Sequence, residues 1–473
     1  MAAAPLWTAA DFLAATGGEA SGDLPDVTGI SIDTRTLEKG DAFFAILGDR
    51  FDGHDFAKAA LEKGASCAVV VDSRAAEFSD AGCVIGVANV LRALEDVGKA
   101  ARARSSARVI GVTGSVGKTG TKEALKLVLA PSGETYASAA SHNNHWGVPL
   151  SLSRFPRSAD FGIFEMGMNA PGEIGPLSRM VRPHISIITT VEPVHIEFFK
   201  SVEAIADAKA EIFEGTEPGG TVLLNRDNLQ YKRLAAAAKE RGLTVVGFGE
   251  HGLAEIKLLN SVCEPGYSAV TASIMGDEVT YKIGAPGRHL VQNSLAVMGA
   301  VKLAGGDLAR AGMAYGQLHA PKGRGERTLI GEIDHTALLI DESYNANPAS
   351  MRAAIANLAL TPVQAGGRRI AVLGDMLELG DSSRDLHAQV AKEINRVGLD
   401  LVFACGSNMA ALYEALPPER QGGYAGAAED LKDSVVGAVR PGDAVMVKGS
   451  LGSRMGPIVE ALKTRHGVLD EAS

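Results

Sequence analysis

The sequence is poor in cysteine, in aromatic residues and in basic charge. Its 473 residues include 5% aromatic side chains and carry a formal net charge of −10 at pH 7. The acidic balance argues against general binding of nucleic acid or of a membrane surface, although it leaves room for a local basic pocket. The cysteines are Cys67, Cys83, Cys263 and Cys405. They have no C-x-x-C spacing, so we expect reduced, buried thiols rather than a zinc site or a disulfide framework.

Long apolar runs are also missing. No uninterrupted apolar stretch approaches the length of about 18 residues that a membrane span needs. The amino-terminal segment MAAAPLWTAADFLAATGG has no basic region followed by an apolar one, so it does not resemble a secretion signal. We therefore expect a cytoplasmic protein with no membrane insertion. The chain is too long for one hydrophobic core, and its length suggests about three domains.

Short apolar runs alternate with longer helical patterns along the chain. The runs are CAVVV (67–71), VIGVT (109–113), FGIFEMG (161–167), ISIITTV (185–191), TVLLN (221–225), IAVLGD (370–375), LVFACG (401–406) and AVMVKGS (444–450). This alternation predicts an α/β architecture with parallel sheets. A polar connector precedes Arg108, and the segment QLHAPKGRGER (317–327) is rich in turn-forming and charged residues. These breaks predict three domains, at 1–107, 108–319 and 320–473.

The segment VIGVTGSVGKTGTKE (109–123) indicates a phosphate-binding loop between a strand and a helix. The expected loop residues are Gly114, Ser115, Val116, Gly117, Lys118, Thr119 and Gly120. Backbone N–H groups of such a loop, together with the positive end of the helix dipole, bind phosphate. The lysine would reach the β- and γ-phosphates, and the threonine hydroxyl would reach Mg²⁺. Val112 stands where the usual G-x-x-x-x-G-K-[ST] pattern has glycine, so an ordinary strand-to-helix turn remains an alternative.

Polar residues beside glycine turns also gather in the first domain. The segment SIDTRTLEKGDAFFAILGDRFDGHDF contains Asp33, Thr34, Arg35, Asp52 and His54. These side chains could bind a polar ligand, but a β-hairpin with capped turns would explain the same residues.

Further candidates follow the predicted strands of the central domain. Asn143 and Asn144 precede a helix start, and Glu165 ends an apolar strand, where a carboxylate is well placed to bind magnesium. His195 lies just past another strand, and Lys209 lies on a helix. Taken singly, the glutamate could cap a turn, the histidine could be structural and the lysine could be solvated.

Taken in order, the motifs TGSVGKT, EMG, VHI and AKAEIF resemble the central ATPase domain of the Mur ligases. These are ATP-dependent, amide-forming enzymes of peptidoglycan precursor synthesis, and their phosphate loop also lacks a glycine at the place of Val112. The segment GRHLVQNSLAV resembles the end of that domain, where an asparagine, here Asn293, lies near the nucleotide. The segment KGRGER is similar to the hinge that supplies an arginine, here Arg324, to the phosphates.

The C-terminal motifs distinguish between members of this family. LLIDESYNANPASMRAAI (338–355), AVLGDMLELGD (371–381) and VKGSLGSRM (447–455) resemble the last ligase of the series, which joins D-Ala-D-Ala to UDP-MurNAc-tripeptide. The D-N-P-R motif typical of the preceding ligase is absent. The resemblance implies a central P-loop-type ATPase domain with a parallel sheet. A small N-terminal α/β domain that binds the UDP-sugar and a Rossmann-like C-terminal ligase domain would flank it, in a monomer.

The resemblance also implies roles for the candidate residues. Lys118, His195, Lys209 and Arg324 would be catalytic, and Thr119, Glu165, His195 and Lys209 would bind Mg²⁺, in total two ions. Lys209 is often carbamylated in this family. Tyr344 and Asn345 would face the ATP nucleotide or the incoming dipeptide, while Asn143, Asn144 and the polar residues of the first domain would contact the UDP-sugar substrate.

Two segments depart from the family pattern, and two other classes of protein remain open. In the segment NNHWG, His145 and Trp146 replace the glutamate and isoleucine of the NNEIG sequence that is common in the family. In the G-x-H segment, the departures are Leu290 and Gln292. Another ligase of the same architecture, such as folylpolyglutamate synthase, would share the central motifs. A nucleotide-dependent switch protein would share the phosphate loop alone.

Overall fold

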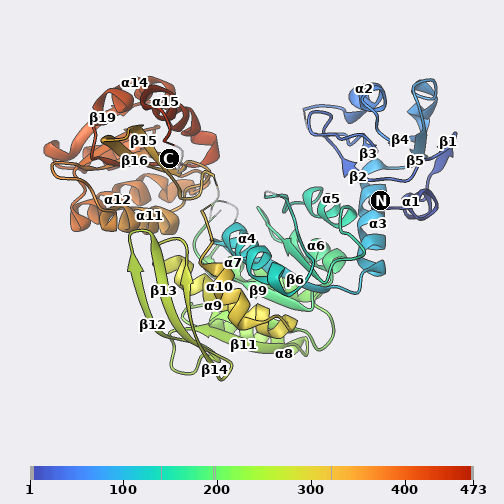
Figure 1. Cartoon of the computed structure of the whole chain (residues 1–473), viewed down its shortest axis with the longest axis horizontal. Helices are drawn as coiled ribbons and strands as arrows, with labels where there is room; N and C mark the ends of the chain where they lie inside the picture. Colours follow the sequence, from blue (N-terminus) through green and yellow to red (C-terminus); the bar gives the residue numbers. More distant parts are fainter. Residues whose placement is uncertain are drawn as a thin grey trace.

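Three separate sheets follow one another along the chain. The structure, a computed structural model, describes residues 5–469 except 49, 140, 195, 196, 198 and 321. In this part of the chain the sheets have five, nine and six strands. The N-terminal and C-terminal sheets lie at opposite ends of the molecule, with the central sheet between them (Figure 1). The predicted three-domain α/β architecture is confirmed.

The N-terminal sheet has the order β1-β5-β4-β3-β2 and is parallel except at β1. Its strands are β1 (Glu19–Ser21), β2 (Gly29–Ser31), β3 (Asp41–Phe44), β4 (Cys67–Val71) and β5 (Val84–Val87). The helices of this part are α1 (Ala9–Thr16), α2 (Ala57–Glu62) and α3 (Val90–Arg104). Strands β2 and β3 are parallel neighbours and form no hairpin with each other, but an antiparallel bridge between Leu47 and Asp52 closes a tight hairpin turn later in this segment.

The central sheet has the order β14-β13-β12-β11-β10-β9-β6-β8-β7. Its strands are β6 (Arg108–Thr113), β7 (Thr135–Ala137), β8 (Phe161–Glu165), β9 (Ile185–Ile188), β10 (Thr221–Asn225), β11 (Thr244–Gly249), β12 (Ile256–Glu264), β13 (Tyr267–Ile274) and β14 (Asp277–Ile283). Strands β6 to β12 are parallel, but β12, β13 and β14 pair antiparallel. The predicted parallel sheet is therefore confirmed, and the antiparallel strands β13 and β14 extend it beyond β12.

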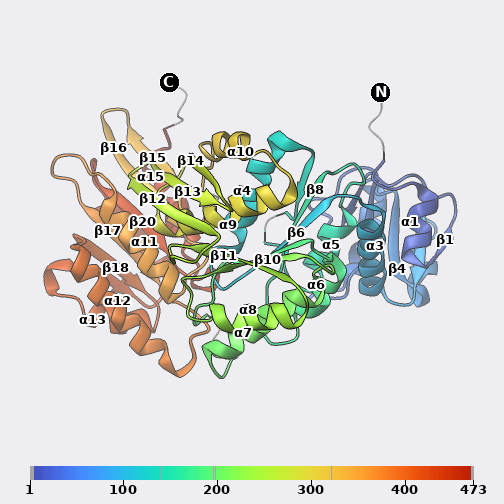
Figure 2. The same ribbon diagram turned by 90° about the horizontal axis from the view of Figure 1, so that it is seen from below.

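Helices cover both faces of the central sheet (Figure 2). They are α4 (Lys118–Leu129), α5 (Gly147–Ser153), α6 (Ile174–Val181), α7 (Val202–Ala210), α8 (Tyr231–Glu240), α9 (Arg288–Ala304) and α10 (Leu308–Tyr315). In β10, Val222 and Leu224 pack with residues of α6, α7 and α8, while Leu223 packs with residues of α4, α9 and α10. Successive side chains of a strand point to opposite faces, so a strand covered on both faces needs a continuous apolar run.

The C-terminal sheet has the order β15-β16-β20-β17-β18-β19 and is parallel except at β15. Its strands are β15 (Glu326–Glu332), β16 (His335–Glu342), β17 (Arg369–Gly374), β18 (Leu401–Cys405), β19 (Gln421–Ala425) and β20 (Ala444–Lys448). One face packs on α11 (Pro348–Leu360), α12 (Ser383–Val397) and α13 (Met409–Glu414), and the other on α14 (Ala428–Ala438) and α15 (Gly456–His466). None of the described helices is long and apolar enough to cross a membrane.

The two junctions between the sheets differ in chemistry. One buried apolar cluster runs from Trp7 and Phe12 of the N-terminal part to Val148 and Phe155 of the central part. Across the other junction, Arg327 Nη1 of the C-terminal part donates to a backbone carbonyl of the β12–β13 turn, at 2.8 Å. Among the described residues, no buried apolar cluster spans this second junction. The C-terminal part is therefore joined to the rest mainly through polar contacts.

Candidate functional site

A cavity of about 590 Å³ lies between the central and C-terminal parts, at the carboxyl ends of the central strands. Ligands of α/β proteins bind at this edge of the sheet, because the loops that follow the strands meet there. The predicted residues that line the cavity are Ser115, Val116, Gly117, Lys118, Thr119, Gly120, Asn143, Glu165, Asn293, Arg324, Tyr344 and Asn345. The structure thus brings together motifs that lie more than 200 positions apart in the sequence.

The loop between β6 and α4 requires glycine at two positions. Gly114 and Gly117 have φ values of 144° and 88°, which L side chains rarely adopt. A Cβ atom at Gly114 would collide with Thr189, and one at Gly117 would collide with the amide of Asn293. The tight turn therefore places backbone N–H groups at the start of α4, where an anion is stabilised by the helix dipole.

Lys118 opens α4 and folds back over the loop. Its Nζ donates to the carbonyl oxygen of Gly114 at 2.7 Å. Burial lowers the pKa of Lys118, the carboxylate of Glu165 opposes this shift, and the nearby cation Arg324 adds to it. The ammonium therefore lies in an enclosed site beside both a carboxylate and a second cation, as a group that binds phosphate does.

Glu165 supplies an oxygen that has no hydrogen-bond partner in the described part of the chain. Its Oε1 accepts a hydrogen bond from Asn143 Nδ2 at 2.7 Å, while its Oε2 is buried and unpaired. The hydroxyl of Thr119 also lines the cavity, 3.5 Å from the hydroxyl of Ser141. A carboxylate and a hydroxyl oxygen suit Mg²⁺, which takes its remaining ligands from phosphate and water. Among the residues described, no group of three or more histidine, cysteine, aspartate or glutamate side chains is placed to hold a metal ion.

Lys209 lies on α7, with only 3% of its surface exposed. Its side chain has no hydrogen bond within the described ranges. Burial and repulsion from Lys118 hold the pKa of Lys209 well below the usual 10.5, which favours the neutral, nucleophilic amine. His195, predicted to act beside it, lies outside the described residues.

Arg324 reaches from the C-terminal part into the cavity. Its Nη2 donates to Ser141 Oγ of the central part at 3.2 Å. Its guanidinium lies over the ring of Tyr344, 4.3 Å from the ring centre, in a geometry that favours cation–π attraction. The backbone of Gly323 is fixed by hydrogen bonds with Asp341 and Tyr344 at 3.1 and 3.0 Å. These contacts therefore fix the position of Arg324 at the junction of the central and C-terminal domains.

Ser141 and Lys448 are cavity residues that were not assigned a role from the sequence. Ser141 joins Thr119 to Arg324, as described above. The almost fully buried Lys448 donates to Glu342 Oε2 at 3.2 Å and to the carbonyl oxygen of Asn345 at 2.9 Å. Ser141 and Lys448 both lie in motifs that resemble the family, SHNN and VKGS, but only the folded chain shows which side chains they contact.

The predicted residues of the N-terminal part lie outside the cavity lining. Asp33 forms an ion pair with the exposed Arg35 at 2.6 Å, which lowers the pKa of Asp33. His54 is buried: its Nδ1 is 2.6 Å from Asp52, and its Nε2 accepts a hydrogen bond from the backbone N–H of Val71 at 3.0 Å. Because both ring nitrogens are engaged, His54 holds its loop in place. Its contact with a substrate stays a prediction.

Two further predicted substrate residues also have local partners. The carbonyl oxygen of Thr34 accepts a hydrogen bond from Lys63 Nζ at 2.8 Å. The side chain of Asn144 accepts one from the backbone N–H of Gly147 at 2.9 Å, at the start of α5. Asn144 therefore stabilises the helix start, whereas its neighbour Asn143 points into the cavity and orients Glu165.

Comparison with known proteins gives a consistent result. Residues 26–105 match the catalytic domain of the Mur ligase family, residues 112–301 the Mur ligase middle domain, and residues 323–451 the Mur ligase glutamate ligase domain. The UDP-N-acetylmuramoyl-tripeptide–D-alanyl-D-alanine ligase of Rickettsia prowazekii is 30% identical, over 96% of this chain and 99% of the relative. The ligase of the same name from Bacillus subtilis is 33% identical over 92% of this chain and 93% of the relative. A crystal structure of MurF from Acinetobacter baumannii is 27% identical and covers 98% of this chain and 100% of that chain, with a TM-score of 0.83. The chain belongs to the Mur ligase family.

Proposed function

We propose that this protein is an ATP-dependent ligase that joins D-Ala-D-Ala to UDP-MurNAc-tripeptide in peptidoglycan precursor synthesis. The observation that carries the proposal is the cavity in which the phosphate loop, the unpaired oxygen of Glu165 and Arg324 meet. Curated relatives with this activity in their names align over nearly the whole chain. The products would be UDP-MurNAc-pentapeptide, ADP and phosphate.

The proposed reaction has two steps, because a carboxylate resists attack by an amine at neutral pH. The terminal carboxylate of the tripeptide attacks the γ-phosphorus of ATP, which gives an acyl phosphate and ADP. The amine of D-Ala-D-Ala then attacks the acyl carbon. The resulting tetrahedral intermediate expels phosphate and loses the proton of the amine, which leaves the amide.

The chain's own groups would act mainly by position and charge. Backbone N–H groups at the start of α4 and the ammonium of Lys118 would bind the β- and γ-phosphates. Arg324 would neutralise charge that develops on the transferred phosphoryl group. Asn293 beside the loop, together with Tyr344 and Asn345 on the opposite wall, would contact the nucleotide or the dipeptide.

Thr119 and Glu165 fit a magnesium site beside the phosphate loop, since they offer a hydroxyl and a carboxylate oxygen that has no partner among the described residues. Bound Mg²⁺ would neutralise phosphate charge in the transition state. A second ion would be held by His195 and Lys209, as the family resemblance implies. Lys209 would serve as an anionic ligand only after its neutral amine has added CO₂, with loss of a proton, to give a carbamate.

A rescue experiment tests the carbamate. Lys209→Ala should lose activity, because the second ion loses its ligand, and short-chain carboxylic acids such as acetate or propionate should restore part of it. The measurement is turnover against acid concentration. The same acids should leave the wild-type rate unchanged, and a variant that no acid rescues would argue against the carbamate.

The three parts of the chain would share the substrates. The domain at 1–107, with Asp33, Arg35 and Asp52, would bind the UDP-sugar, the domain at 108–319 would bind ATP, and the domain at 320–473 would bind the dipeptide. One chain supplies all the groups invoked, so we propose a monomer. ATP and nucleotide-linked sugars are intracellular substrates, so we propose that it acts in the cytoplasm.

The decisive test is phosphate release from ATP and Mg²⁺ by the purified protein. UDP-MurNAc-tripeptide and D-Ala-D-Ala are supplied together and then each is withheld. Release that requires both, with a new mass for UDP-MurNAc-pentapeptide, is the expected result. Release supported by a single amino acid would indicate another ligase of this architecture, and release that ignores both substrates would indicate a nucleotide switch.

A further inference from the structure

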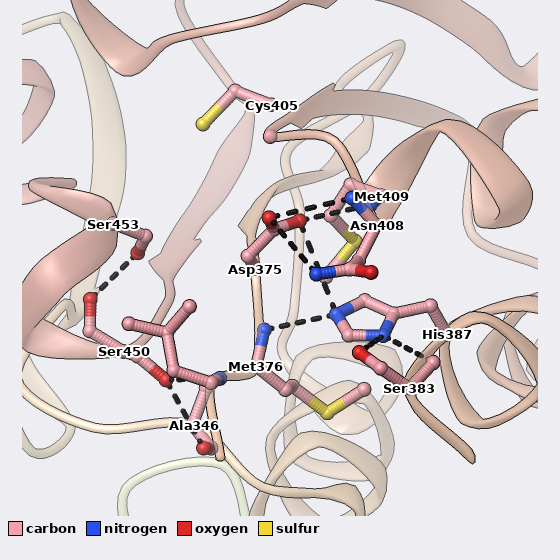
Figure 3. Close-up of polar contacts among 12 residues, drawn as sticks. Ala346, Asp375, Met376, Ser383, His387, Cys405, Asn408, Met409, Ser450 and Ser453 are labelled. Carbon is pink, nitrogen blue, oxygen red and sulfur yellow. Dashed lines mark hydrogen bonds and ion pairs between the residues drawn. The ribbon is translucent and has the colours of Figure 1, made fainter. Parts of the chain in front are cut away.

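A polar cluster at the carboxyl edge of the C-terminal sheet has no part in the roles proposed above (Figure 3). Its centre is His387 on α12, which is completely buried. His387 faces the segment 375–380 that follows β17, and its Nε2 lies 4.0 Å from the carboxylate of Asp375. A buried polar side chain at this edge of a parallel sheet shapes the loops that a ligand meets.

The bonds of His387 fix its protonation state. Its Nε2 lies 2.9 Å from the backbone nitrogen of Met376, which can only donate, so Nε2 is the acceptor. Its Nδ1 lies 2.6 Å from the carbonyl oxygen of Ser383, which can only accept, so Nδ1 carries the proton. Burial lowers the pKa of His387, consistent with a neutral ring. The ring therefore ties α12 to the backbone of segment 375–380.

Ser450 holds the same segment from the side opposite His387. Its Oγ accepts a hydrogen bond from the backbone N–H of Leu377 at 3.0 Å and donates to the carbonyl oxygen of Ala346 at 3.3 Å. Its own N–H donates to the carbonyl oxygen of Asp375 at 3.1 Å. The loops that follow β16, β17 and β20 are thus joined into one surface, and His387 anchors the middle loop.

The carboxylate of Asp375 is not available to a ligand. It accepts a hydrogen bond from the backbone N–H of Met409 at 2.8 Å and weaker ones from Asn408, and it thereby caps α13. The carboxylate of Asp375 is therefore used internally. The segment exposes the side chain of Leu377, which is 43% exposed, together with that of Glu378.

The tip of the segment lies close to the central domain. A Cβ atom at Gly380 would lie 3.6 Å from the Cα of Glu197, in the chain that follows β9. A few residues earlier, that chain is bonded to the phosphate loop, where Ser115 N–H donates to the carbonyl oxygen of Thr190 at 2.8 Å. Segment 375–380 therefore reaches from the C-terminal sheet edge to Glu197 of the central domain.

We propose that His387 is a positioning residue for the dipeptide. By holding the backbone of Met376, it fixes segment 375–380 in the place where the amine of D-Ala-D-Ala meets the acyl phosphate. This inference rests on the proposed function, in which ATP occupies the central domain and the UDP-sugar the N-terminal one. The C-terminal sheet edge then remains for the third substrate.

The test separates the three substrates. His387→Phe keeps a ring of similar volume but leaves the N–H of Met376 without an acceptor, so KM for D-Ala-D-Ala should rise about tenfold. KM for ATP and for UDP-MurNAc-tripeptide should stay within about twofold of wild type, within the scatter of a substitution that makes no contact with either. His387→Gln retains an acceptor and should restore part of the dipeptide affinity. Ser450→Ala removes the hydroxyl that accepts from Leu377 and should raise the same KM, with little risk to folding.

His184 provides a matched control. Its Nδ1 accepts a hydrogen bond from the backbone N–H of Val109 at 2.9 Å. This contact lies at the amino end of β6, away from the carboxyl ends of the strands where the cavity lies. His184→Phe should lower the melting temperature without a change in KM for the dipeptide. Equal changes in all three KM values, or a loss of stability alone in both His387 variants and Ser450→Ala, would overturn the proposal. Failure of wild type to use D-Ala-D-Ala would instead overturn the proposed function.

Discussion

At the scale of single residues, the candidate side chains differ in how fully their polar atoms are bonded among the described residues. His54 and His387 use both ring nitrogens within the protein. Glu165 keeps one buried oxygen unpaired, and Lys209 is buried beside another lysine. A buried polar group without a hydrogen-bond partner lowers the stability of the fold. Such a group is therefore typical of a site where a bound ligand supplies the missing partner.

Lys118 gives the most direct residue-scale prediction. Lys118→Ala removes the ammonium that would neutralise the β- and γ-phosphates, so kcat should fall by at least about a thousandfold. Steady-state turnover measures the effect, with circular dichroism to confirm folding. Lys126→Ala, an exposed lysine on the same helix, should be close to wild type. A Lys118→Ala enzyme with near-normal turnover would refute the assignment of the loop.

Lys209 gives a second prediction, on stability against pH. The pKa of Lys209 is lower in the folded protein than the usual 10.5, so between the two values the unfolded chain binds more protons and stability rises with pH. In CO₂-free buffer, Lys209→Met should therefore be more stable than wild type at neutral pH, and the difference should vanish above the usual pKa. Chemical denaturation at several pH values measures it. Lys126→Met should show no such trend, and a constant difference for Lys209→Met would contradict the prediction.

At the scale of elements, the sequence predicted eight of the parallel strands, and it predicted neither of the antiparallel strands β13 and β14. The eight apolar runs all became strands, because a strand covered on both faces needs continuous apolar residues. Strands β12 to β14 alternate buried and exposed residues, so their sequences contain no such run. The phosphate-loop motif could be recognised from the sequence although Val112 stands in place of the usual glycine. The approach of Lys209 to Lys118, and that of Lys448 to Glu342, joins distant segments and could not be predicted from local patterns.

The loop after β16 supports a prediction about Arg324. Tyr344 presents its ring to the guanidinium, so Tyr344→Leu should lose the cation–π attraction and allow Arg324 to move. We expect kcat/KM for ATP to fall about fivefold, since such contacts are worth on the order of 1 kcal/mol. Tyr344→Phe keeps the ring and should stay near the wild-type value. If both variants fall equally, the hydroxyl rather than the ring is what matters.

At the scale of the whole molecule, the two junctions predict two units of unfolding. The N-terminal and central parts share one buried apolar cluster, whereas the C-terminal part has its own. Elements with a common core unfold together, and elements joined by polar contacts unfold more independently. We therefore expect the C-terminal part to move more freely relative to the other two, and Arg324 would move with it.

Calorimetry of alanine variants tests this division. Trp7 packs in the shared cluster, and its indole N–H donates to the carbonyl oxygen of Ser153 at 3.0 Å. Trp7→Ala should destabilise the N-terminal and central unit by about 3–5 kcal/mol, and Leu358→Ala, in the C-terminal core, should destabilise its unit by about 2–5 kcal/mol. Each substitution should lower the temperature of one transition only. ATP with Mg²⁺ would contact both units, so it should raise both temperatures and bring the two transitions closer together. A single transition that both variants lower equally would mean that the polar junction couples the parts as strongly as the shared core does.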